Sequence, residues 1–208
     1  MELAGDQVRL IEAVSAANPK TIVVLQTGSP VVMPWLDRVP AVIQAWFPGQ
    51  ECGNAVADVL FGAVAPSGKL PQTFPVRLED NPAYINYPGE GIYVGYRFYK
   101  KKKVEPLFPF GFGLSYTTFS YSDLKLDADS IAPDGRLTVS VDVTNTGSVA
   151  GKEVVQLYIR DVEAEVSLPE KELKGFVKVA LEPGENTTAT LTLHRTSLAY
   201  WHDAEHAW

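Results

Sequence analysis

The sequence predicts two folds in succession, a layered α/β region followed by an antiparallel β-sandwich. In the first region, helix-like segments alternate with continuous runs of β-branched residues, whereas from Phe119 onward apolar residues recur at every second position. The 208 residues are enough for one large domain or two small ones. We therefore predict two domains, at residues 1–117 and 118–208.

The first region alternates helices and strands. Thr21–Leu25 is a continuous, mainly β-branched run without polar-apolar alternation, which is typical of a parallel strand that is buried on both faces. Two strands make an undersized sheet, so we expect strands from upstream sequence to complete the core. The predicted helices lie at residues 6–17 and 51–61, and the predicted strands at residues 21–25 and 41–46.

The second region has the alternation of strands that are half buried. Turn signals such as Pro133-Asp134-Gly135 and Asn145-Thr146-Gly147 separate these runs, as in an antiparallel sandwich. The clearest strands are predicted at residues 137–144, 154–159, 173–181 and 189–193.

Residues 65–117 contain seven of the fifteen prolines, so regular helix is not expected there. Long irregular segments often form binding loops, and this one is rich in aromatic rings, on which sugars stack. The alternative is that most of these rings fill a seam between the two domains. Lys100–Lys103 is interpreted as the solvated tip of a hairpin.

Composition excludes several classes of function. A net charge of −7 disfavours nucleic-acid binding, and no apolar run reaches the roughly 18 to 20 residues of a membrane span. With Cys52 as the only cysteine, no internal disulfide forms, and the compartment stays open between cytoplasm and secretion. His202 and His206 are four residues apart but lack a third ligand, so neither a metal nor a cofactor is expected.

Several motifs resemble those of the family-3 glycoside hydrolases, mainly β-glucosidases. The resemblance rests on Pro109–Phe119 (PFGFGLSYTTF), Trp46–Gly62 (WFPGQECGNAVADVLFG) and Gly89–Arg97 (GEGIYVGYR), with Pro66–Pro75 between them. It covers essentially the whole chain. It implies part of an α/β sandwich domain, followed by an immunoglobulin-like, fibronectin type III-like domain that lacks its last strand and so has an unpaired edge.

The same resemblance implies that no catalytic residue lies in this chain. Such enzymes use an Asp nucleophile on an N-terminal (β/α)8 barrel and a Glu acid/base that precedes the element aligned with Met1–Gln7. Glu2 does not match the acid/base position. The missing barrel domain is thus the expected partner, the parent enzyme acts on an oligosaccharide or β-glucoside, and the isolated chain is expected to be inactive.

Acidic residues elsewhere in the first domain could in principle supply a catalytic pair. Retaining glycosidases place two carboxyl groups roughly 5 to 5.5 Å apart, and the sequence brings no two acids together in this way. These acids are Glu51, Asp58, Glu79, Asp80 and Glu90.

Three residues are candidates for substrate contact: Glu90, Arg97 and Phe112. Glu90 lies in an aromatic loop that is shorter than in many family members, and its alternative role is an ion pair with Arg97 or another cation. Phe112 stands between two glycines and either borders the aglycone site or acts as an interdomain wedge. The alternative function is an independent non-catalytic module for carbohydrate binding or protein association.

Overall fold

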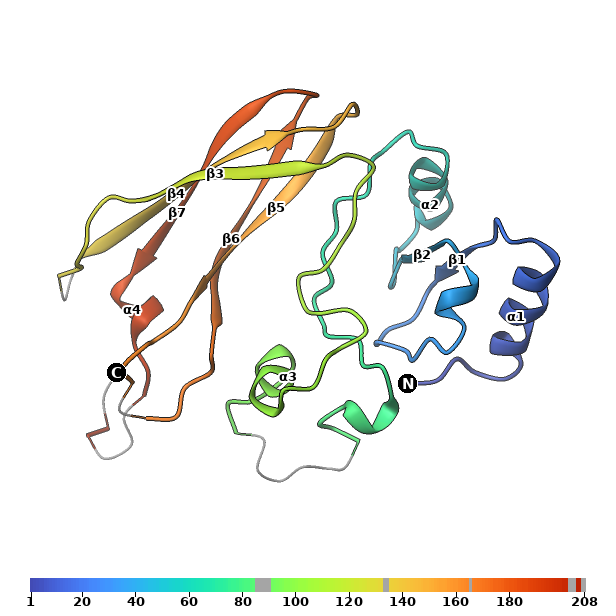
Figure 1. The fold of residues 1–208 in the computed structure, drawn as a ribbon, viewed down its shortest axis with the longest axis horizontal. Coiled ribbons are helices and arrows are strands. Elements are labelled where there is room, and N and C mark those ends of the chain that lie inside the picture. The colour runs from blue at the N-terminus through green and yellow to red at the C-terminus, as the bar shows by residue number, and fades with distance from the viewer. Residues whose placement is uncertain (85–90, 133–134, 165, 202–204, 207–208) are drawn as a thin grey trace. The chain divides into compact units, whose positions relative to one another are not determined.

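The computed structural model describes residues 1–84, 91–132, 135–164, 166–201 and 205–206 (Figure 1). The chain divides into two compact units. Unit 1 consists of residues 1–63 and 70–112, and unit 2 consists of residues 64–69 and 113–208. The α/β class predicted for the first region and the sandwich predicted for the second are both confirmed.

Unit 1 contains a short parallel sheet with helices around it (Figure 1). Its two strands run side by side from the pair Ile22 and Ala41 to the pair Leu25 and Gln44. The helices are α1 (Gln7–Ala17), α2 (Cys52–Leu60) and α3 (Tyr96–Lys102), the strands are β1 (Ile22–Leu25) and β2 (Ala41–Gln44), and single 3₁₀ turns lie at η1 (Leu36–Arg38) and η2 (Leu78–Asp80).

The core of unit 1 lies on one face of this sheet. Val23 and Leu25 point into it, while Ile22, on the opposite face of the same strand, is exposed. This difference follows from the two-residue period of a strand. Trp35 and Phe74 are the largest side chains that are fully buried in this core.

Helix α3 corrects the expectation that residues 65–117 contain no regular helix. The seven prolines of that region all lie outside Tyr96–Lys102, so nothing interrupts the backbone hydrogen bonds. Gly95, with φ of 56°, precedes the helix, and Lys103, in the left-handed conformation, ends it. The lysines therefore belong to the last helical turn, where they favourably face the negative end of the helix dipole, and the hairpin interpretation was wrong.

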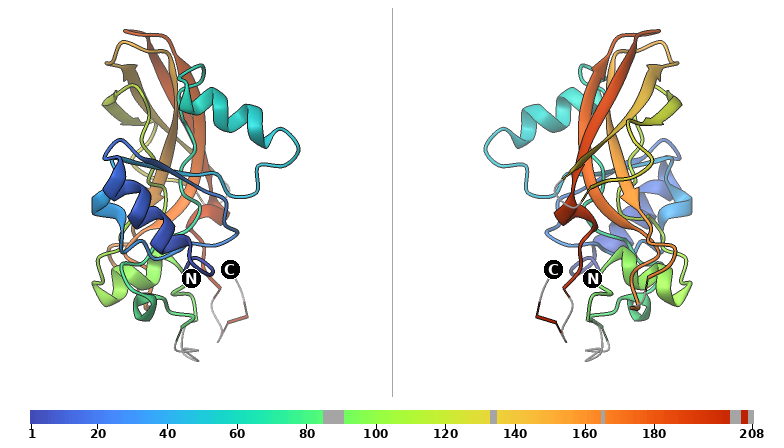
Figure 2. Two further views of the ribbon diagram at one scale, coloured as in Figure 1. Left: turned by 90° about the vertical axis from the view of Figure 1, so that its right-hand side faces the viewer. Right: turned by 90° about the vertical axis from the view of Figure 1, so that its left-hand side faces the viewer.

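Unit 2 is a sandwich of two antiparallel sheets (Figure 2). Val143 of one sheet and Val155 of the other meet in its core, together with Leu181 and Ala189. One sheet has the order β3 (Phe119–Leu126), β4 (Arg136–Asn145), β7 (Asn186–His194), the other pairs β5 (Gly151–Ile159) with β6 (Glu172–Leu181), and a short helix α4 (Arg195–Leu198) follows.

A buried asparagine ties the end of this sandwich together. Asn145 is fully buried, and its side-chain Nδ2 donates to the carbonyl oxygens of Val149 (2.9 Å) and Leu181 (3.0 Å). Its Oδ1 accepts hydrogen bonds from Thr117 Oγ1 (2.6 Å) and the Gly147 amide (3.1 Å). All four hydrogen-bonding positions of the amide are therefore used, as burial of a polar group requires.

Residues 64–69, here called the linking segment, belong to unit 2 although unit 1 flanks them in sequence. The Lys69 ammonium is 3.0 Å from the Glu153 carboxylate and also donates to the Gly113 carbonyl oxygen (2.9 Å). Both charged side chains are largely buried, at 17% and 12% exposure. Tyr121, which is itself half exposed, donates its hydroxyl to the same carboxylate at 3.0 Å, so β3, β5 and the linking segment share one polar cluster.

Candidate functional site

The aromatic region of unit 1 is organised by two chain runs that lie side by side. Phe74 donates its amide to the Phe108 carbonyl oxygen (2.9 Å), and the Leu107 amide donates back to the Phe74 carbonyl oxygen (2.9 Å). Further along, Leu70 donates to the Phe112 carbonyl oxygen (2.8 Å). These bonds satisfy backbone groups that the prolines would otherwise leave without a regular partner.

Four aromatic rings follow one another across these runs. Trp46 meets Phe74 edge-on with ring centroids 6.0 Å apart, and Phe74 meets Phe108 in the same way at 6.3 Å. Phe108 then stacks on Phe112 at 5.1 Å with an interplanar angle of 28°. Both geometries suit the charge distribution of aromatic rings, so this row gives unit 1 a rigid wall.

A second group of rings surrounds α3. Tyr96 stacks on Phe110 with centroids 4.9 Å apart, and the Arg97 guanidinium carbon lies 6.0 Å from the centre of the Tyr96 ring. Arg97 Nη1 also donates to the Ile92 carbonyl oxygen at 3.3 Å. The group combines half-buried ring faces with a cation and could therefore both stack on and hydrogen-bond to a sugar.

Tyr99 is the buried side chain of α3, at 5% exposure. Burial, and to a smaller degree the charge of Asp80, raise the pKa of the Tyr99 phenol to about 12. Asp80 in turn accepts a hydrogen bond from Arg77 Nη2 at 2.9 Å. Tyr99 was not among the predicted site residues, although the spacing of Tyr96 and Tyr99 along one helix face, followed by lysines, was a usable signal.

The three predicted contact residues have different outcomes. Phe112 is half buried in the row of rings of unit 1, and Arg97 lies on α3 beside Tyr96. Glu90 falls outside the described residues. Substrate contact by these three residues remains a prediction.

Of the five acids considered for a catalytic pair, all but Glu90 lie among the described residues. Asp80 is held by Arg77, and Glu51 accepts a hydrogen bond from Asn54 Nδ2 at 2.6 Å. Asp58 is exposed on α2, and Glu79 is exposed in η2. The contacts of Asp80 and Glu51 are local, within three residues of each acid, as in ordinary turn and helix-end structure.

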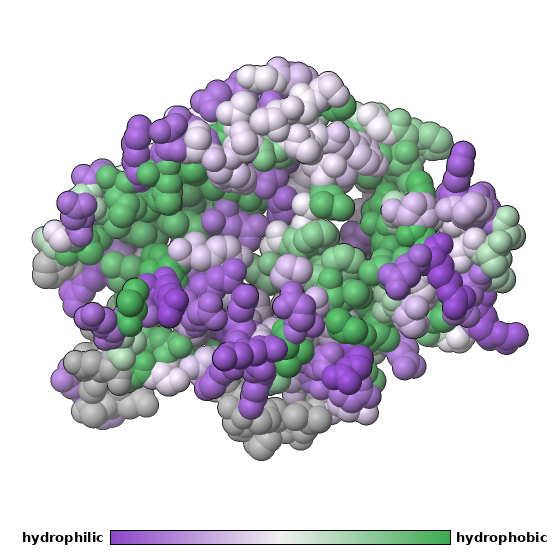
Figure 3. Space-filling model, viewed as in Figure 1, coloured by the Kyte–Doolittle hydropathy of each residue, from purple (hydrophilic) through white to green (hydrophobic). Residues whose placement is uncertain are grey.

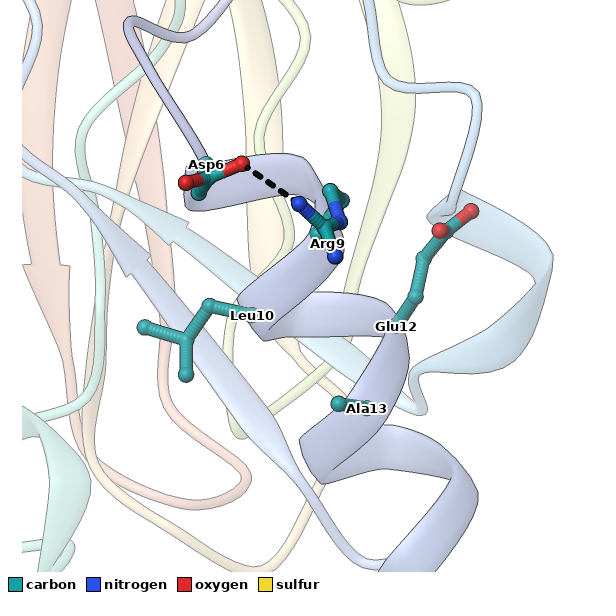
Figure 4. Close-up of a pocket in the computed structure, with 5 residues that line it drawn as sticks. All are labelled: Asp6, Arg9, Leu10, Glu12 and Ala13. Carbon is teal, nitrogen blue, oxygen red and sulfur yellow. Dashed lines mark hydrogen bonds and ion pairs between the residues drawn. The ribbon is translucent and has the colours of Figure 1, made fainter.

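A shallow depression on α1 is of a different kind (Figure 4). It is lined by residues of a single helical stretch. The ion pair between Arg9 and Asp6 (3.1 Å) leaves both side chains 82% exposed, and Glu12 pairs with Arg38 at 3.3 Å, also at the surface. Exposed pairs of this kind contribute little energy. The depression is lined by Asp6, Arg9, Leu10, Glu12 and Ala13.

Within the described part of the chain, no group of three or more His, Cys, Asp or Glu side chains could hold a metal ion. In the same residues, no helix is both long enough and apolar enough to span a bilayer.

The aromatic α/β unit and the sandwich with its buried asparagine define a two-part chain of the kind found in glycoside hydrolases. Residues 1–116 match the model of the glycosyl hydrolase family 3 C-terminal domain, and residues 153–208 match the fibronectin type III-like domain. The chain belongs to glycosyl hydrolase family 3, and the sequence resemblance is confirmed.

The relatives are β-glucosidases. The chain is 52% identical to thermostable beta-glucosidase B of Acetivibrio thermocellus over 100% of this chain and 29% of that protein. It is 53% identical to a beta-glucosidase of Rhizobium radiobacter over 97% of this chain and 26% of that protein. The chain thus spans little more than a quarter of these relatives.

Solved structures agree with this assignment. The beta-glucosidase of Kluyveromyces marxianus in complex with glucose superimposes with a TM-score of 0.91 at 46% identity, covering 99% of this chain and 26% of that one. A beta-glucosidase from Streptomyces venezuelae in complex with D-glucose gives the same TM-score at 44% identity, covering 100% and 28%.

Proposed function

We propose that this chain is the C-terminal portion of a retaining β-glucosidase or β-xylosidase-like enzyme that removes terminal β-linked sugars. The single observation that carries the proposal is the match of the whole chain, at 52% identity, to little more than a quarter of a β-glucosidase. The Asp nucleophile and the Glu acid/base then lie in upstream sequence. The chain contributes walls of the sugar pocket and is inactive alone.

The acids of unit 1 support this division of labour. A retaining mechanism needs one carboxylate free to attack and a second, roughly 5 to 5.5 Å away, to protonate the leaving oxygen. Asp80 and Glu51 are instead engaged by Arg77 and Asn54, while Asp58 and Glu79 stand exposed to solvent.

Unit 1 has exposed apolar surface of the kind that packs against further protein. We propose that this further protein includes the upstream barrel domain. A parallel sheet is normally covered on both faces, yet Ile22 on the second face of β1 is 48% exposed. Phe47 and Phe61 are also exposed, at 83% and 89%, and Figure 3 shows hydrophobic surface beside α2. Apolar residues in this number indicate a surface that packs against further protein.

A turnover assay tests the proposal. The 208-residue chain, and a fusion of this chain to the preceding part of the A. thermocellus relative, are each incubated with p-nitrophenyl β-D-glucoside. The fusion is expected to release nitrophenol and the chain alone to stay at the blank rate. Turnover by the chain alone would contradict the assignment of both carboxylates to upstream sequence.

The fusion also tests the three substrate-contact residues. If Glu90, Arg97 and Phe112 border the pocket, Phe112→Ala and Arg97→Ala raise KM more than they lower kcat. Phe176→Ala, at a position of unit 2 that is 69% exposed, is the matched control and leaves both constants unchanged. Binding of cellobiose by the isolated chain in calorimetry, together with an inactive fusion, would favour the non-catalytic binding module.

A further inference from the structure

One triplet of the sequence fits the acceptor pattern for N-linked glycosylation. The pattern is asparagine, then any residue except proline, then serine or threonine. Of the six asparagines in the chain, only Asn186 meets it, in Asn186-Thr187-Thr188. The proposed hydrolase function makes no use of this triplet, so its place in the fold decides what it can do.

The triplet stands at an exposed corner of unit 2. Asn186 is the first residue of β7 and follows directly on a tight turn over residues 182–185. The Glu185 amide closes this turn on the Glu182 carbonyl oxygen at 3.0 Å, and Gly184 has a positive φ of 76°. Residues 182–186 are all exposed. Acceptor triplets are normally found at surface positions of this kind.

Asn186 and Thr188 lie on the outward face of their sheet. Ala189 is 2% exposed in the sandwich core, and side chains alternate along a strand, so Asn186 and Thr188 both point away from that core. In line with Asn186 across the sheet are Thr144 of β4 and then Ser120 of β3. Both neighbours are short, so a sugar attached to Asn186 has room above this face and displaces no core side chain.

The side-chain amide of Asn186 can carry a sugar without losing its own contact. Its Nδ2 donates to Thr144 Oγ1 at 2.7 Å, and an amide nitrogen carries two hydrogens. A glycan replaces one of them and leaves the other for Thr144 or for water. Asn145 is the opposite case, because it is fully buried and all four of its hydrogen-bonding positions are used.

We propose that Asn186 is a site of N-linked glycosylation, used when the chain enters a eukaryotic secretory pathway. The donor is an oligosaccharide linked to a lipid pyrophosphate. A bond forms between Asn186 Nδ2 and C1 of the first sugar, the bond between C1 and the pyrophosphate oxygen breaks, the lipid pyrophosphate leaves, and Nδ2 loses one proton. The glycan then covers the outward face of β4 and β7 and leaves the core intact. This inference does not rest on the proposed function.

The fold also places the transfer in time. In the folded sandwich the Thr188 hydroxyl, which defines the triplet, donates to Asp142 Oδ1 at 2.6 Å, and the backbone of the triplet is paired with β4. Both the hydroxyl and the backbone are accessible only before β7 pairs with β4. The sugar is therefore added to the unfolded strand, and the outward position of Asn186 lets the sandwich close afterwards.

Expression of the 208-residue chain behind a cleavable leader in the secretory pathway of a yeast tests the site. The chain is recovered from cells and medium together, so that molecules that fail to fold are counted as well. We expect a form whose mass falls on treatment with peptide N-glycosidase, with Asn186 converted to aspartate in the peptide that contains it. An unmodified Asn186 in all of the recovered chain would overturn the proposal.

Two neighbouring threonines provide the matched control. Thr188→Val removes the hydroxyl that the acceptor pattern requires and should abolish the modification, whereas Thr188→Ser should retain it. Thr187→Val makes the same exchange at the unrestricted middle position and should also leave the modification in place. Modification of Thr188→Val to the same extent as the wild type would contradict the assignment.

Hydrogen exchange tests whether the folded sandwich tolerates the glycan. The glycosylated chain is compared with the same sequence made in bacterial cytoplasm, which carries no glycan. Amides of β4 and β7 should exchange at rates that agree within about twofold, because the sugar stands on the outward face. Exchange that is faster in the glycosylated chain by more than about tenfold would overturn the placement of the site. Failure here is distinct from failure of the proposed function, which is measured by turnover.

Discussion

Replacement of Asn145 by aspartate tests whether one buried amide holds the end of the sandwich. The exchange keeps the size of the side chain but replaces the Nδ2 group that donates to the carbonyl oxygens of Val149 and Leu181. Two hydrogen bonds are lost, and two buried carbonyl oxygens lose a partner, at about 1–3 kcal/mol each. We therefore expect unit 2 to lose about 3–5 kcal/mol of its free energy of unfolding.

The pH dependence gives this prediction a second signature. An aspartate at position 145 is buried against carbonyl oxygens, so folding raises its pKa, and the folded variant holds its proton more tightly than the unfolded variant. The penalty should therefore be smaller near pH 4.5 than near pH 7.5, because the neutral acid can still donate one hydrogen bond.

The assay must measure the stability of unit 2 separately, because the two units need not unfold together. Hydrogen exchange of peptides from β4 and β6 gives the local free energy of opening. Asn186→Asp is the matched control, since Asn186 is exposed and donates a single hydrogen bond to Thr144 Oγ1 at 2.7 Å; we expect a cost of about 0.5 kcal/mol there. A penalty at position 145 no larger than the control, or one independent of pH, would refute the reasoning.

Two further predictions concern buried charge and burial of a phenol. Lys69→Met should lower the free energy of unfolding of unit 2 by about 3 kcal/mol, because it leaves the carboxylate of Glu153 buried without its cation. The double variant with Glu153→Leu should lose far less in the same hydrogen-exchange experiment. Equal losses would contradict this account of the pair. The raised pKa of Tyr99, about 12, means that the folded chain holds the phenol proton more tightly than the unfolded chain, where tyrosine titrates near ~10. Its contribution is thus complete below pH ~10 and is lost as the pH rises through about 12, by up to about 2–3 kcal/mol. Urea unfolding of the wild type and of Tyr99→Phe at pH 8 and pH 11 measures this effect. The free energy of unfolding of the wild type should fall relative to that of the variant at the higher pH. A difference between the two proteins that does not change with pH would exclude the mechanism.

The sequence predicted those elements whose pattern is local. The helix expected at residues 6–17 is α1 at Gln7–Ala17, and the strand expected at 137–144 is β4 at Arg136–Asn145. Both rest on hydrophobic periodicity, which needs only neighbouring residues. Helix α3 was missed because the prolines of the whole region outweighed a seven-residue stretch that contains none.

The long-range contacts within each unit depend on pairing that periodicity does not encode. Asn145 reads as an ordinary turn residue in Asn145-Thr146-Gly147, and only the folded backbone shows that its side chain reaches Leu181. The Lys69–Glu153 pair joins segments far apart in the chain. For the candidate site, the sequence proposed Arg97 and Phe112, whose contact with substrate stays a prediction. It did not predict the ring partners that position them, Phe108 for Phe112 and Tyr96 for Arg97.

The placement of residues 64–69 in unit 2 has a consequence for engineering and for protein evolution. The polypeptide passes between the units three times, at residues 63/64, 69/70 and 112/113. A crossover at 112/113 that grafts a foreign sandwich onto this α/β unit would carry Lys69 away from the carboxylate of Glu153 and the carbonyl oxygen of Gly113. Successful exchange of the sandwich would therefore require that the hexapeptide travel with it, as a separate second graft.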